Sequence, residues 1–162
     1  MTGTTAPLGT FDWVAATGGQ LTAAERRRLL RPIAATHAAN AVGRVAMLAH
    51  LNSGRRADID VAGLRPPTSA LASAAEQEAR SRLSPALLNH SYRTYAFGAA
   101  LGALADIDVD RELLFAAAML HDIGLTGPVD RIDFTLASAR IARDIAERVG
   151  LSTAATETMR TA

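Results

Sequence analysis

Residues 84–124 decide the fold of this chain, and they read SPALLNHSYRTYAFGAALGALADIDVDRELLFAAAMLHDIG. Ser84 followed by Pro85 is typical of a helix start, with the serine as N-cap and the proline in the first helical position. This helix is expected to run to about Ala105. Asp106–Asp108 then predicts a turn, and a second helix should begin near Asp110 and continue through Leu120. The segment therefore predicts an antiparallel helical hairpin.

The hairpin places two histidines at similar distances from its turn. His90 lies about fifteen residues before the turn and His121 about thirteen after it, so the chain travels roughly 22 Å out and 20 Å back. We therefore expect the two side chains to lie side by side. His90 also shares a helix face with apolar residues at helical spacing, which predicts an inward imidazole. That face consists of His90, Thr94, Phe97, Leu101 and Leu104.

Two imidazoles and the adjacent carboxylate of Asp122 form a ligand set that suits zinc, iron or manganese. Asp122 is expected at the carboxyl end of its helix, where a carboxylate is unfavourable unless a cation offsets it. A metal ion would do so, and so would an arginine. A core histidine bonded to a backbone carbonyl is the alternative interpretation of His90. The sequence thus predicts a divalent-metal site at His90, His121 and Asp122, with these structural alternatives open.

Outward from the hairpin, we divide the chain into three parts. Residues 1–20 are expected to be loose and anchored by Phe11 and Trp13. Residues 21–69 should form an N-terminal helical layer and a connection, and residues 70–162 the core.

A capping-box pattern at Thr22 and Glu25 opens a helix in the N-terminal layer. Pro32 is expected to end or kink it, and a well-packed second helix should follow over residues 33–51. The triplet Arg26-Arg27-Arg28 is interpreted as a solvated helix face. Residues 70–82 predict a further helix.

The composition favours an all-α protein, because 35 of the 162 residues are alanine, the strongest helix former. Cysteine is absent, which excludes disulfides and thiolate ligands. All 17 basic residues are arginine, so lysine Schiff bases and a P-loop lysine are excluded too. A net charge of only +1 with dispersed arginines argues against nucleic-acid binding, and no stretch is long enough for a membrane span. We expect a cytoplasmic protein with a small-molecule substrate.

Asn89–Tyr95 and Leu120–Gly124 together resemble the HD-domain metal-dependent hydrolase superfamily. Leu64–Ala70 is similar to the approach to the domain in its cyanamide-hydratase-like branch. The resemblance implies an all-α, HD-domain-like helical bundle that binds a divalent metal through His90, His121 and Asp122. It further implies hydrolysis or hydration of a nitrile-type or phosphoester substrate, with Asp122 in a catalytic role. Arg93 follows His90 by three residues and could hold an anionic substrate in a catalytic role or simply pair with an acid.

Two departures from the family pattern accompany this resemblance. The family's last ligand is an aspartate far downstream, whereas only Asp130, Asp133 and Asp144 follow the His-Asp pair here. We expect a C-terminally truncated bundle, with self-association through an incompletely covered core. Leu125 also replaces a lysine that some phosphohydrolases carry. A non-catalytic helical module is therefore the alternative function, and a helix-turn-helix regulator is disfavoured because no recognition helix stands out.

Overall fold

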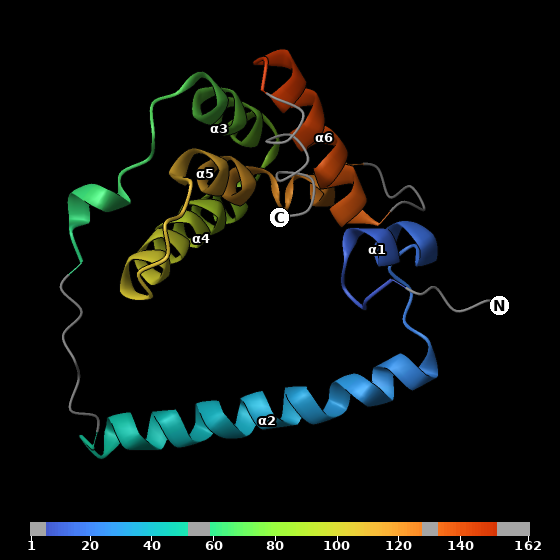
Figure 1. The fold of residues 1–162 in the computed structure, drawn as a ribbon, viewed down its shortest axis with the longest axis vertical. Helices are drawn as coiled ribbons and strands as arrows, with labels where there is room; N and C mark the ends of the chain where they lie inside the picture. Colours follow the sequence, from blue (N-terminus) through green and yellow to red (C-terminus); the bar gives the residue numbers. More distant parts are fainter. Residues whose placement is uncertain (1–5, 52–58, 128–132, 152–162) are drawn as a thin grey trace. The chain divides into compact units, whose positions relative to one another are not determined.

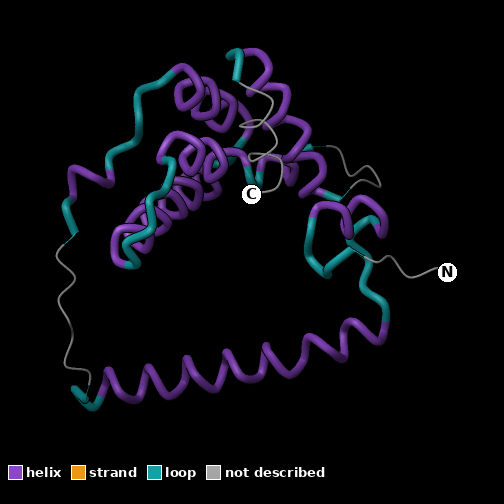
Figure 2. The backbone as a smooth tube through the Cα atoms, in the orientation of Figure 1, coloured by secondary structure: helices purple, strands orange, loops and turns teal. Residues whose placement is uncertain are grey.

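The computed structural model describes residues 6–51, 59–127 and 133–151. These residues form α-helices joined by loops and two short 3₁₀ helices, with no strand among them (Figures 1 and 2). In chain order the elements are α1 (Phe11–Thr17), α2 (Ala23–Leu48), η1 (Val61–Leu64), α3 (Ala70–Arg82), α4 (Pro85–Leu104), α5 (Arg111–Leu120), η2 (Ile123–Thr126) and α6 (Phe134–Arg148). The predicted all-α fold is confirmed.

The chain divides into two compact units, and α2 forms one of them by itself. The capping box at Thr22 and Glu25 is present, and a single helix continues through Pro32 to Leu48. The prediction that a second helix starts after the proline is wrong. Proline removes one internal hydrogen bond at a cost of about 3 kcal/mol, and the Arg, Leu and Ala residues on both sides retain high helix propensity.

α2 is the helix described in its unit, so the packing of residues 33–51 against another helix stays a prediction. Within this unit Val45 and Leu48 are exposed. Arg26, Arg27 and Arg28 are exposed, as predicted.

The other unit is a helical bundle in which α5 packs against both α3 and α4 (Figure 1). α6 packs against α3, α5 and η2. Phe115 of α5 is fully buried at the centre, and the ring of Tyr95 meets it edge-on at 5.0 Å. Such an aromatic pair contributes about 0.5–1.5 kcal/mol beyond its buried area. The large fully buried side chains are Tyr95, Phe115, Leu71, Met119, Leu120, Ile123 and Ile145.

The predicted hairpin is confirmed at its caps. Ser84 caps α4 with Pro85 in its first turn, and the Asp110 carboxylate caps α5 by accepting from the amides of Glu112 and Leu113. Residues 70–82 form α3, as predicted.

The expected inward face of α4 is wrong, because Phe97, Leu101 and Leu104 are 66%, 64% and 53% exposed. α4 instead packs through small residues. A Cβ built on Gly98 would lie 3.2 Å from Leu114 Cδ1, and one built on Gly102 would lie 2.7 Å from Val109 Cγ2. The glycines allow α4 to approach α5 and the segment leading into it closely, while Phe97, Leu101 and Leu104 lie on an exposed face of α4.

The connection before α3 is ordered against the bundle. The carbonyl oxygen of Arg65 accepts hydrogen bonds from Tyr95 Oη at 2.9 Å and from Arg111 Nη2 at 2.6 Å. Arg111 Nη2 also donates to Tyr95 Oη at 3.0 Å. One backbone carbonyl thus links η1 to both helices of the hairpin.

Near the N-terminus, α1 packs against α6. Trp13 is only 5% exposed, so its predicted role as an anchor is confirmed. No helix in the described part of the chain is long and apolar enough to cross a membrane.

Candidate metal centre

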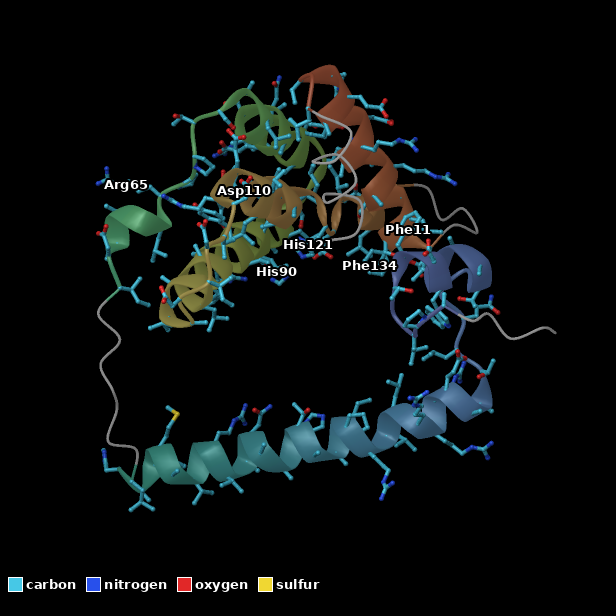
Figure 3. All side chains as sticks on the ribbon, in the orientation of Figure 1. Phe11, Arg65, His90, Asp110, His121 and Phe134 are labelled. Carbon is cyan, nitrogen blue, oxygen red and sulfur yellow. The ribbon has the colours of Figure 1, made fainter. Side chains whose placement is uncertain are left out.

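His90, His121 and Asp122 lie together where the middle of α4 meets the end of α5. His90 is on α4, His121 is the C-cap of α5, and Asp122 follows directly. The Asp122 Oδ2 atom is 3.2 Å from His121 Nε2 and 3.7 Å from His90 Nε2. The two imidazole ring centres are 5.3 Å apart, and Figure 3 shows both rings on the same side of the hairpin. The predicted convergence of the three side chains is confirmed.

These distances fit a shared cation. One ligand atom from each of the three residues lies within 4.8 Å of the others. Two N or O atoms held about 2.1 Å from one ion at tetrahedral angles would lie roughly 3.4 Å apart. The two contacts to Asp122 Oδ2 lie on either side of that value. The donor set and its spacing therefore fit a divalent metal.

A backbone contact orients the imidazole of His121. Its Nδ1 lies 2.9 Å from the carbonyl oxygen of Ala118, which can only accept, so Nδ1 carries the proton. In the neutral ring Nε2 then has a lone pair facing Asp122 Oδ2. A metal ion between these two acceptors would satisfy both of them.

Asp122 follows the carboxyl end of α5, where the helix dipole is negative. Its side chain is only 16% exposed. The predicted alternative was an arginine partner, but in the described ranges its only ion-pair partners are the two histidines. A cation bound between these three side chains would offset the charge of Asp122.

Solvent reaches the site on its histidine side. The side chains of His90 and His121 are 49% and 35% exposed, so the predicted inward orientation of His90 is wrong. The interpretation of His90 as a core histidine fails for the same reason. Catalytic metal sites keep one position free, and a metal ion at these three candidate ligands would have one side open to solvent.

None of the downstream aspartates that the structure describes joins the cluster. Asp133 caps α6 through the amide and hydroxyl of Thr135. Asp144 forms an exposed ion pair with Arg143, as the sequence indicated. Asp130 lies outside the described residues.

α5 ends at Leu120, so Gly124 lies beyond the helix, where it contacts α6. Its amide donates to Ser138 Oγ at 2.9 Å, and a Cβ at this position would lie 2.1 Å from the Phe134 carbonyl oxygen. Sequence reasoning missed Ser138 because it carries no ligand atom and lies on another helix.

Other polar residues of α4 have distinct environments. Arg93 is exposed. Tyr92 Oη donates to Glu76 Oε1 and accepts from Arg80 Nη2. Burial, and then the bond to Glu76, raise the pKa of Tyr92 above its ordinary 10.0.

The family model of the HD domain matches residues 87–161, a range that contains all three candidate ligands and covers just under half of the chain. This part of the chain is HD-domain-like. The match and the all-α bundle support the HD-domain superfamily, whose members are metal-dependent hydrolases that typically bind divalent metals. The cluster of His90, His121 and Asp122 is the candidate site for such an ion in the HD-domain-like segment. Neither the curated proteins nor the solved structures include a significant match.

Proposed function

We propose that this protein is a metal-dependent hydrolase or hydratase that acts on a small molecule at His90, His121 and Asp122. The observation that carries the proposal is the convergence of two imidazole nitrogens on one carboxylate oxygen, at 3.2 and 3.7 Å. Zinc, iron or manganese suits these ligands. When bound, such an ion supplies a Lewis acid and lowers the pKa of water toward about 7.

Residues around the site would orient the ligands, offset the charge of the ion and bind the substrate. The Ala118 carbonyl keeps His121 in the tautomer whose Nε2 is available as a ligand. Asp122 offsets part of the ion's charge, and the exposed edge of His90 leaves one side open to substrate. Arg93, three residues after His90 on α4, is the candidate to stabilise negative charge that develops on the substrate.

For the substrate we propose a nitrile-type carbon, as in cyanamide, to which water adds across the carbon–nitrogen triple bond. The support is the resemblance of residues 64–70, 89–95 and 120–124 to the cyanamide-hydratase-like branch. Leu125 adds to it, because this 51% exposed apolar side chain stands where some phosphohydrolases have a lysine. A phosphoester is the second candidate, favoured by the exposed cation of Arg93.

A non-catalytic module that binds or self-associates is the alternative function. The observation that favours it is the exposed apolar face of α4, formed by Phe97, Leu101 and Leu104. Exposed apolar patches of this kind often mark interaction sites.

Metal analysis and turnover test the proposal together. The purified chain, loaded separately with Zn²⁺, Fe²⁺ or Mn²⁺, would be assayed on cyanamide and on a panel of nucleotides and phosphoesters. We expect one ion per chain and a turnover that are both lost in His121→Ala. Both should persist in His37→Ala, which removes an exposed histidine of α2. Turnover that is absent, or independent of His121, would refute catalysis, and metal-free protein with unchanged folding would favour the module.

A further inference from the structure

The segment that carries Asp122 is fixed at both ends. On its amino side, His121 is held to α5 by its amide, which donates to the Ala117 carbonyl at 2.9 Å, and by its ring. On its carboxyl side, Ile123 is 1% exposed in the core and the next residue, Gly124, is bonded to α6. Asp122 has no side-chain cap hydrogen bond of its own at the start of η2. Its position therefore depends on these two anchors.

Ser138 provides the carboxyl-side anchor. It is 5% exposed on α6, and its Oγ accepts the Gly124 amide at 2.9 Å. The absence of a Cβ at Gly124 makes this contact possible, since an added Cβ would lie 2.9 Å from Ser138 Oγ and 3.0 Å from Ala137 Cβ. Gly124 is not in the left-handed backbone region, so the position requires space for α6 rather than an unusual φ.

We propose that Ser138 is a positioning residue for the metal centre, acting through Gly124 to hold the Asp122 carboxylate beside the two imidazoles. The inference rests on the proposed function, because it assumes that Asp122 binds the ion. Ser138 is 16 residues beyond Asp122 in sequence and on a different helix, so α6 contributes to the site without supplying a ligand. Outer groups that orient ligands typically change metal affinity 10–100-fold when they are removed.

The test is Zn²⁺ affinity measured by calorimetry on the full chain, with the visible spectrum of the Co²⁺-loaded protein as a second readout. We expect Ser138→Ala to weaken Zn²⁺ binding about 10-fold and to alter the Co²⁺ bands. Ser138→Thr keeps the hydroxyl and should restore both. A purely structural role would lower stability without changing either readout under conditions where the protein is fully folded.

Ser91→Ala is the matched control. Ser91 is fully buried beside His90, and its Oγ has no hydrogen-bond partner among the described residues, so its removal should leave Zn²⁺ affinity within about twofold. Equal affinity in wild type and Ser138→Ala would overturn the role of Ser138 while leaving the metal centre intact. Equal losses in Ser91→Ala and Ser138→Ala would overturn it as well. A wild-type chain that binds no Zn²⁺ would overturn the proposed function together with the inference.

Discussion

Replacing Gly124 by alanine should disrupt the contact between α6 and the loop that follows Asp122. The new Cβ would lie 2.1 Å from the Phe134 carbonyl oxygen, whereas carbon and oxygen atoms in close contact lie about 3.3 Å apart. Phe134 is the first residue of α6, so its carbonyl belongs to the first helical turn. To accept the methyl group, either this turn or the loop must move by roughly 1 Å.

The change in the free energy of unfolding of Gly124→Ala is a sum of three contributions. Overpacking of a tight site costs about 1–3 kcal/mol, and loss of the Gly124 bond to Ser138 about 1 kcal/mol more. The reduced freedom of alanine in the unfolded chain offsets about 0.4–1 kcal/mol. We expect a net destabilisation of about 1–4 kcal/mol, or a Tm lowered by about 2–14 °C for a chain of this size.

Urea and thermal unfolding followed by tryptophan fluorescence would measure this loss. Trp13 is the single tryptophan, is buried and belongs to the unit that contains α6, so its signal does not report on α2. Gly127→Ala is the matched control three residues away. Among the described residues a Cβ there would meet only the Gly124 carbonyl, at 3.7 Å, and φ is −75°, so we expect no loss and a gain of up to about 1 kcal/mol. Equal unfolding midpoints for Gly124→Ala and wild type would refute the steric argument.

Three further predictions concern metal binding, the carboxylate of Glu76 and the connection before α3. Zn²⁺ at 100 times its Kd should stabilise the folded chain by about 2.7 kcal/mol in thermal unfolding, and a similar shift in Asp122→Asn would contradict the ligand assignment. The hydrogen bonds from Tyr92 and then Arg80 lower the pKa of Glu76 below 4.5, so its stabilising effect is present above pH 4.5 and is lost as pH falls through the lowered pKa. The difference in unfolding free energy between wild type and Glu76→Gln should therefore become smaller toward pH 3. A constant difference from pH 7 to pH 3 would contradict a stabilising role of the ionised Glu76 carboxylate. Tyr95→Phe removes the bond to the Arg65 carbonyl and should cost about 1 kcal/mol with faster proteolysis near that residue, whereas an unchanged digestion rate would show that Tyr95 does not hold the connection.

The parts of the fold that sequence predicted are those set by local chemistry. Ser84, Pro85 and Asp110 act on the turn in which they stand, so their caps can be recognised without knowledge of the rest of the chain. The proximity of His90 and His121 followed from the same caps, because two helices of similar length joined by a short turn must run back along each other.

The orientation of α4 could not be predicted in the same way. Helical periodicity identified a large apolar stripe, and burial of such a stripe is the usual outcome. In this hairpin the face with Gly98 and Gly102 is the one that packs, because close approach of two backbones brings more atoms into contact than long side chains held further apart. A pattern based on hydrophobicity gives glycine no weight and therefore assigns α4 the wrong inner face.

The geometry of the candidate metal centre also depends on glycines that a sequence pattern gives no weight. Ligand residues are recognised by their donor atoms, and His90, His121 and Asp122 were identified on that basis. Their separations also depend on residues without donor atoms, since Gly98 sets the approach of α4 to α5 and Gly124 sets that of α6 to the loop. A shift of about 1 Å is enough to spoil coordination at metal–ligand distances near 2.1 Å. An added Cβ at Gly124 requires a shift of that size, whereas one at Gly98 requires the Leu114 side chain to move by only a few tenths of an ångström. We therefore expect Gly124→Ala to weaken metal binding by displacing Asp122, although His90, His121 and Asp122 are all retained in the sequence.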